Sequence, residues 1–187
     1  KTLRNRMGRR FYDWLKERYG SKEALLEAWG ERAWNSFEYE KLAYDDWEAG
    51  LVMPAGGHPW YLDPAQLEGS QAFRKQRLFD TMLFLYEIQN EFYARYVEAL
   101  RETGYDGAVL ASNWQAGRAF SHYYNLHSDY LTGIIDRHNY FGGSRDGLIR
   151  NQSMLRVPGS GSFSAGMQQV VDRPFMLSEW IHVEPNE

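Results

Sequence analysis

A short apolar stretch near the end of the chain, residues 173–180, constrains the fold most strongly. It reads Arg-Pro-Phe-Met-Leu-Ser-Glu-Trp. Proline can begin a strand but cannot lie inside one, and three consecutive apolar residues are typical of a strand buried on both faces. The stretch therefore predicts a strand that begins near Pro174 and ends on Glu179.

The end of this predicted strand carries a carboxylate, Glu179, and an indole, Trp180. Barrels of eight parallel strands keep their catalytic groups at the carboxyl ends of the strands, and an indole offers a flat apolar surface to a sugar ring. The alternative is a glutamate that meets solvent or caps a loop. This segment alone leaves both interpretations of Glu179 open.

The composition is that of a globular domain and argues against several classes of partner. Of the 187 residues, 43% are hydrophobic and 25% are charged, which suffices for one domain with a real core. A net charge of −4 argues against nucleic acid. No apolar run approaches the roughly 18 residues of a membrane span. Cysteine is absent, which excludes thiol catalysis but leaves the compartment open, with a secreted or periplasmic location favoured.

The first part of the chain is predicted to contain two helices and a long loop. Apolar residues at helical spacing predict a helix over residues 2–18. Ser21 and Gly30 are typical caps of a second, short helix between them. Residues 31–69 lose this periodicity and are rich in Trp, Pro and Gly, as in a loop that folds over a site.

A long helix is predicted over residues 70–103, which contain neither Pro nor Gly. Ser70 and Gly104 stand where its caps are expected. The apolar positions that step by three or four residues are Leu78, Met82, Leu85, Ile88, Phe92, Tyr96 and Leu100. We expect this stripe to be buried, with Leu85, Ile88, Phe92 and Leu100 packed against the strands.

Two further strands are predicted over residues 107–114 and 133–141, so that residues 107–180 hold three strands, each polar at its carboxyl end. This order is typical of a parallel α/β fold. A complete (β/α)8 TIM barrel takes about 250 residues. We therefore expect a partial barrel, about strands 5 to 7 with the preceding helices, completed by strands 1 to 4 upstream and strand 8 downstream.

The run FYDWLKERYGSKEALLEAWG, residues 11–30, resembles a segment of family 42 β-galactosidases and related retaining glycosidases of clan A. In that family the pattern F-x-x-WL-x-x-RYG-[ST]-x-x-ALN-x-AWG follows the strand that carries the acid/base. Leu26 departs from it, because the family often has Asn there. The resemblance implies a (β/α)8 barrel with an Asn-Glu acid/base ending strand four and a nucleophilic Glu ending strand seven.

The run His138-Asn139-Tyr140 is similar to the His-x-Tyr that many clan members carry at the end of strand six. In those enzymes the Tyr hydroxyl is hydrogen-bonded to the nucleophile. The resemblance implies that Glu179 is the nucleophile, with Tyr140 as its hydrogen-bond partner. His138 and Trp180 are then expected to line the substrate pocket.

Each of these residues also has a plain structural interpretation. His138 fits a core histidine, and Tyr140 fits a buried aromatic with a bonded hydroxyl. Strand alternation places Asp136, His138 and Tyr140 on one side of their strand. Asn113 and Trp114 end the first predicted strand and are candidates for the border of the sugar site; a loop turn with a packed indole fits them as well.

A second Asn-Glu pair occurs at Asn90 and Glu91 within the predicted long helix. At 100° per residue Glu91 falls about 140–160° from the centre of the apolar stripe. Arg95, four residues on, makes a favourable helix-surface pair with it. We therefore expect Glu91 on the solvated helix surface and the acid/base upstream of Lys1.

The sequence thus predicts a retaining β-glycoside hydrolase that acts on a β-galactoside or related oligo- or polysaccharide through a covalent intermediate. Carbohydrate and the remainder of the barrel are the expected partners. We expect no cofactor, metal, nucleic acid or membrane. The alternatives are a non-catalytic carbohydrate-binding barrel and an α/β scaffold whose long helix is a partner surface.

Overall fold

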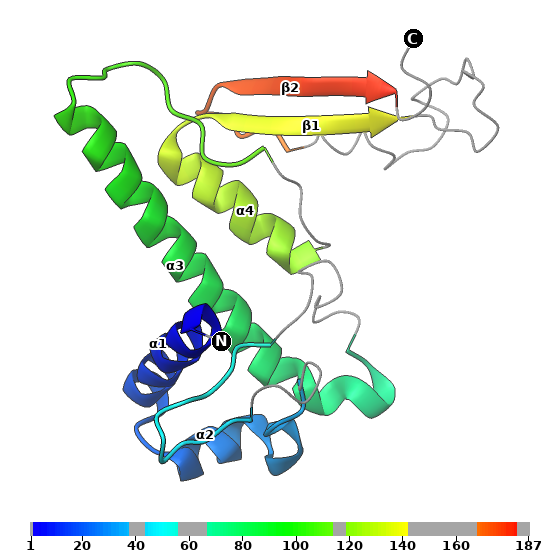
Figure 1. The fold of residues 1–187 in the computed structure, drawn as a ribbon. Helices are drawn as coiled ribbons and strands as arrows, with labels where there is room; N and C mark the ends of the chain where they lie inside the picture. The colour runs from blue at the N-terminus through cyan, green and yellow to red at the C-terminus, as the bar shows by residue number, and fades with distance from the viewer. Residues whose placement is uncertain (1, 38–43, 56–66, 114–118, 142–167, 183–187) are drawn as a thin grey trace. The chain divides into compact units, whose positions relative to one another are not determined.

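A computed structural model describes residues 2–37, 44–55, 67–113, 119–141 and 168–182. The chain divides into two compact units, one made of Lys1–Ile88 with Ala116–His122 and the other of Gln89–Gln115 with Tyr123–Glu187. Each unit is described by itself below. Figure 1 labels the helices and strands.

Helices α1 (Thr2–Tyr19) and α2 (Lys22–Trp29) begin the first unit, as the sequence predicted. Gly20 separates them with a φ of 78°, a left-handed conformation that glycine adopts without strain. Ser21 caps α2, because its side chain accepts a hydrogen bond from the backbone N–H of Ala24 at 3.3 Å. A short 3-10 helix, η1 (Glu31–Ala33), follows α2.

Helix α3 (Lys75–Glu102) is the predicted long helix, but it begins later than expected. The preceding residues Gly69–Arg74 form a 3-10 helix, η4, so the prediction that Ser70 caps the α-helix is wrong. The backbone N–H of Gln71 donates to the carbonyl of Glu68, and this i to i+3 bond gives the turn its tighter geometry. The predicted end is confirmed, since Gly104 follows α3 with a φ of 87°.

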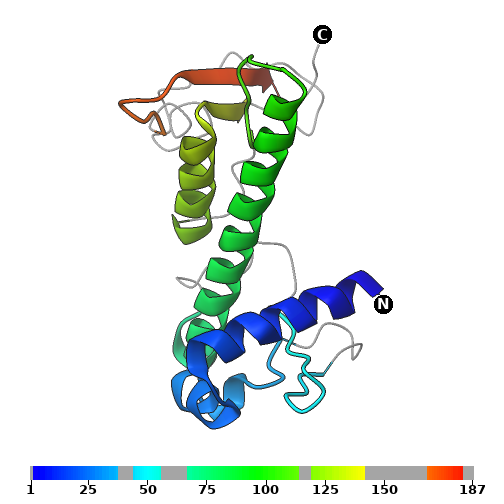
Figure 2. The same ribbon diagram turned by 90° about the vertical axis from the view of Figure 1, so that its left-hand side faces the viewer.

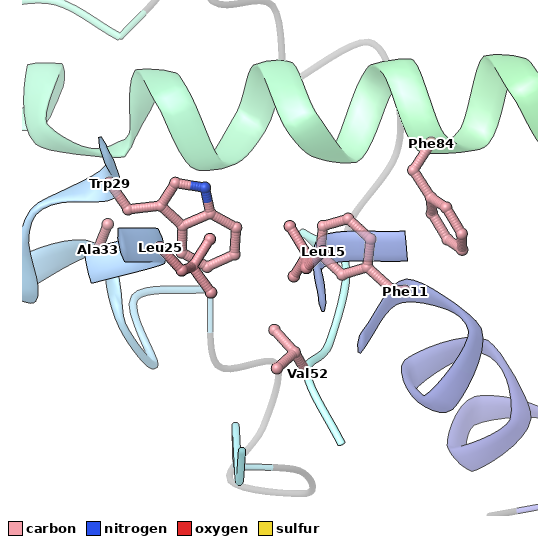
Figure 3. Packing of buried hydrophobic residues seen from close by; sticks show 7 residues of the cluster. All are labelled: Phe11, Leu15, Leu25, Trp29, Ala33, Val52 and Phe84. Atoms are coloured by element: carbon pink, nitrogen blue, oxygen red, sulfur yellow. The ribbon is translucent and has the colours of Figure 1, made fainter. Parts of the chain in front are cut away.

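The core of the first unit lies between α1, α2 and the first half of α3. Figure 3 shows its buried side chains, which are Phe11, Leu15, Leu25, Trp29, Ala33, Val52 and Phe84. The ring centroids of Phe11 and Phe84 are 4.8 Å apart. The indole nitrogen of Trp29 points toward α3 (Figure 3).

Asp80 on α3 explains why the motif in residues 11–30 carries polar groups at fixed places. The hydroxyl of Tyr19 and the Nε1–H of Trp29 both donate to Oδ2 of Asp80, each at 2.6 Å. Burial raises the pKa of Tyr19, and the Asp80 carboxylate raises it further. The Tyr of the RYG run and the Trp of the AWG run therefore tie α1 and α2 to one carboxylate on α3.

The buried face of α3 differs from the predicted apolar stripe. Three polar residues, Arg77, Asp80 and Thr81, are buried beside Leu78 and Phe84. The predicted core residues Leu85, Phe92 and Tyr96 are instead 40%, 58% and 55% exposed. The predicted burial is confirmed for Leu78 but wrong for these three residues, because the buried residues of α3 lie between Arg77 and Phe84, where α1, α2 and the loop pack on the helix.

The second unit contains most of α4 (Ala119–Thr132) and the parallel strands β1 (Ile135–Phe141) and β2 (Phe175–His182). Figures 1 and 2 both show the two strands side by side and α4 leading into β1. Both strands and their parallel pairing confirm the prediction. Helix α4 was not predicted, although residues 119–132 contain neither Pro nor Gly and Gly133 follows them.

Residues 107–113 form no strand, so the strand predicted over residues 107–114 is wrong in its described part. Two backbone groups in this segment hydrogen-bond to side chains instead of to a neighbouring strand. The hydroxyl of Tyr105 donates to the carbonyl of Ala108, and the N–H of Ser112 donates to the Asp129 carboxylate on α4. The described residues hold one sheet of two strands. A partial barrel of three strands is therefore not confirmed.

Candidate active site

A bulge in β2 decides which face of the sheet Glu179 occupies. The pairing runs through Arg137 opposite Leu177 and resumes with His138 opposite Glu179, so Ser178 is an extra residue on β2. An extra residue in one strand shifts the alternation of all later side chains by one position. Glu179 consequently shares the face of His138 and not that of Leu177.

His138 contacts both residues of the bulge. Its Nδ1 atom lies 3.0 Å from Oε2 of Glu179, and its Nε2 atom lies 3.1 Å from Oγ of Ser178. The side chain of His138 is 11% exposed and that of Glu179 is 48% exposed. The imidazole is therefore largely enclosed while the carboxylate remains open to a ligand.

Asp136 lies two residues before His138 on the same face of β1 and is only 4% exposed. Its Oδ1 atom accepts the backbone N–H of Ser178 at 3.0 Å, and its Oδ2 atom accepts the Ser178 hydroxyl at 2.6 Å. Asp136, Ser178, His138 and Glu179 thus form one continuous chain of polar contacts. Strand alternation predicted that Asp136 and His138 share a face, whereas no sequence pattern indicated a role for Ser178.

The opposite face of β1 is closed by helix α4. Arg137 donates from Nη1 to Oδ2 of Asp129 at 2.6 Å, and both side chains are 0% exposed. Arg137 also donates from Nε to Oε1 of Gln168. Burial raises the pKa of Asp129 to about 6, against the opposing effect of the Arg137 charge. Among the described residues, the face with Asp136 and His138 therefore carries the candidate site.

The prediction that Glu179 ends its strand is wrong. Strand β2 continues to His182, because the three residues after Glu179 still pair with β1. The backbones of Tyr140 and Trp180 lie in these strands, opposite Ile181 and Asn139, respectively. The side chains of Tyr140 and Trp180 lie outside what the structure describes.

The remaining candidates lie elsewhere in the chain. Asn113 is exposed at the end of the irregular segment, and Trp114 lies outside the described residues. Glu91 lies on α3 with Oε1 3.7 Å from Nη1 of Arg95, and their side chains are 50% and 78% exposed. The predicted helix-surface position of Glu91 is confirmed.

The described residues contain neither a metal-binding cluster nor a helix that could cross a membrane. No group of three or more His, Asp or Glu side chains there could hold a metal ion. Among the helices of the described part, none is both long and apolar enough to cross a membrane.

Comparison with protein families places the chain among the glycoside hydrolases. A family model described as beta-galactosidase, that of glycoside hydrolase family 42, matches residues 2–183. The chain therefore belongs to this family, and the resemblance found in residues 11–30 is confirmed. The family implies a TIM barrel and a hydrolase of carbohydrate metabolism. Searches of curated proteins and of solved structures gave no match.

Proposed function

We propose that β1 and β2 are strands six and seven of the barrel of a retaining β-glycoside hydrolase, and that Glu179 is its nucleophile. The observation that carries this proposal is the contact of Glu179 with His138 on one face of two parallel strands. The other face is occupied by the Arg137 and Asp129 ion pair. The remainder of the barrel and a β-galactoside or related saccharide are the proposed partners.

Retaining glycosidases need two carboxyl groups about 5–5.5 Å apart, one to protonate the leaving oxygen and one to attack the anomeric carbon. Glu179 suits the attacking role because half of its side chain is exposed and His138 holds one of its oxygens. Glu91 suits neither role, since it lies on an exposed helix surface beside Arg95. We therefore propose that the acid/base comes from another strand.

The roles of the other candidates follow from the family resemblance. We propose that Tyr140 donates a hydrogen bond to Glu179 and that His138 and Trp180 line the sugar site. Asn113 and Trp114 are proposed to border it. A Tyr hydroxyl bonded to a carboxylate is a charge-assisted hydrogen bond and would keep the attacking oxygen in place.

The test is a Glu179→Gln substitution in the intact protein that contains this chain. Glutamine keeps the shape but removes the charged attacker, so kcat on an aryl β-galactoside should fall by several orders of magnitude while binding survives. Glu179→Gly should regain turnover with added azide, because a small anion can occupy the vacated space. Near wild-type turnover by Glu179→Gln would refute the proposal.

A wild-type protein that binds saccharides without hydrolysing them would support the alternative, a non-catalytic carbohydrate-binding barrel. Absence of both binding and turnover would support the scaffold alternative. An active wild type whose Glu179→Gln variant is inactive would contradict both alternatives.

A further inference from the structure

We propose that Asp136 is a positioning residue for Glu179, acting through Ser178 in the bulge of β2. This inference rests on the proposed role of Glu179 as the nucleophile. It names the residue that orients the Glu179 carboxylate. Both described hydrogen bonds of the Asp136 side chain go to Ser178, the residue that shifts the alternation of β2.

Asp136 holds the backbone of β2 at the bulge. Ser178 is the extra residue of the bulge, and its N–H points to the Asp136 carboxylate at 3.0 Å. A part-buried N–H outside a regular ladder needs an acceptor, and Asp136 supplies one from within β1 itself. The bulge is therefore anchored at the residue next to Glu179, which fixes the direction in which Glu179 leaves the strand.

Asp136 also decides how the protons are ordered along the Ser178 and His138 side chains. The single hydroxyl proton of Ser178 is donated to Oδ2 of Asp136, so Oγ can only accept a hydrogen bond from His138. The Nε2 atom of His138 must then carry a proton for Ser178, and Nδ1 carries the proton that it donates to the Glu179 carboxylate. Asp136 thus sets the protonation of the ring nitrogen remote from the proposed nucleophile.

An Asp136→Asn substitution should reverse this order without changing the shape of the side chain. The Ser178 N–H needs the amide oxygen as its acceptor, so the amide NH₂ must face Oγ. The Ser178 hydroxyl then donates to Nε2 of His138, so Nε2 loses its proton while Nδ1 keeps the proton that it directs at Glu179. A residue that only stabilised the fold would produce no such exchange.

The experiment compares Asp136→Asn and Ser178→Ala in the intact enzyme. We expect each to lower kcat on an aryl β-galactoside by about 10- to 100-fold with KM changed less than about threefold, since aiming acts on the chemical step. Ser128→Ala is the matched control, because Ser128 is buried on α4 and donates to the Tyr124 carbonyl at 2.9 Å. The control should retain wild-type kcat.

The spectroscopic readout is the ¹⁵N spectrum of histidine-labelled enzyme, with the His138 signals assigned by their loss in His138→Gln. Wild type should show a protonated Nε2 at His138, and Asp136→Asn should show a neutral ring protonated at Nδ1. A wild-type ring protonated only at Nδ1, or wild-type kcat in both Asp136→Asn and Ser178→Ala, would overturn the inference.

The two proposals fail in different ways. If Glu179→Gln is inactive and Glu179→Gly is rescued by azide, but Asp136→Asn and Ser178→Ala keep wild-type kcat, only the positioning role falls. If Glu179→Gln keeps wild-type turnover, the proposed nucleophile and the positioning role fall together. Should Asp136→Asn fail to fold, the kcat of Ser178→Ala decides.

Discussion

The Nδ1 atom of His138 lies 3.0 Å from Oε2 of Glu179, and this contact joins β1 to β2 at the proposed nucleophile. It depends on the extra residue Ser178, because the regular alternation of β2 would turn Glu179 to the face of Leu177. The bulge at Ser178 therefore places the proposed nucleophile within reach of His138.

Replacing His138 with Gln should lower kcat by about 10- to 100-fold, because a hydrogen bond to a charged group contributes about 1.5–3 kcal/mol. The loss should be smaller than that of Glu179→Gln, since the attacking carboxylate remains. Steady-state kinetics at saturating substrate measures it. His127→Gln, at an exposed position of α4, is the control and should leave kcat unchanged.

Replacing Tyr140 with Phe should also lower kcat by less than Glu179→Gln does. Only one proposed hydrogen bond to the nucleophile is lost, again worth about 1.5–3 kcal/mol for a charged acceptor. The same kinetic assay gives the comparison. A Tyr140→Phe variant as fast as wild type would show that the hydroxyl does not support Glu179 during the reaction.

Replacing Glu91 with Gln should leave kcat/KM within about twofold of wild type, the range expected of a group outside the transition state. The reason is its position on the exposed surface of α3, beside Arg95. The measurement is kcat/KM between pH 5 and 9. If the kcat/KM of Glu91→Gln no longer fell at high pH, where a general acid loses its proton, Glu91 would be the acid/base.

Replacing Arg77 with Met should destabilise the first unit by about 3–5 kcal/mol, because it leaves a buried carboxylate without its cation. Arg77 donates to both carboxylate oxygens of Asp45, at 2.6 and 3.0 Å, and both side chains are 2% exposed. Urea unfolding of the intact protein measures the change.

Arg95→Met is the matched control for Arg77→Met, since both arginines lie on α3. The Arg95 side chain is 78% exposed in its pair with Glu91. An exposed pair contributes at most about 1 kcal/mol, so the control should unfold at nearly the wild-type urea concentration. Equal losses in the two variants would contradict a special role for the buried pair.

The raised pKa of Asp129 predicts a pH dependence of stability. Its pKa is about 6 in the folded state against 3.8 ordinarily, so the folded protein binds the proton more tightly than the unfolded one. The resulting stabilisation is fully present below about pH 4 and is lost as the pH rises to about 6. The unfolding temperatures of wild type and Asp129→Asn, measured from pH 4 to pH 7, test this.

As the pH rises from 4 to 6, the unfolding temperature of the wild type should fall relative to that of Asp129→Asn. Above about pH 6 the difference between the two unfolding temperatures should stay constant. The variant lacks the titrating group but keeps the surrounding charges, so the comparison isolates Asp129. A constant difference across the whole range would show that the Asp129 pKa is not raised by burial.

Several elements could be predicted because their signals are local. Gly20 and the cap Ser21 bound α1 and α2, and the apolar spacing of the chain identified α3. Pro174 and the apolar run after it marked β2. These signals depend on residues within one or two turns of each other, so they survive without knowledge of the rest of the fold.

The buried face of α3 could not be predicted, because it depends on partners far along the chain. Asp80 is buried since Tyr19 and Trp29 donate to it from two other helices. Arg77 is buried because Asp45 meets it from a loop 32 residues away. Apolar periodicity favours residues such as Leu85 and Phe92 over these polar ones, although both are exposed in the structure.

The chain's own sequence determined its family, its principal helices and the strand pair that carries His138 and Glu179. Only the tertiary structure decided that these two residues meet. Ser178 enters the sheet as an extra residue, and a carboxylate 42 residues earlier, Asp136, accepts its N–H and hydroxyl. Strand alternation alone assigns Glu179 to the opposite face, because a bulge is created by pairing between strands and leaves no mark in either strand by itself.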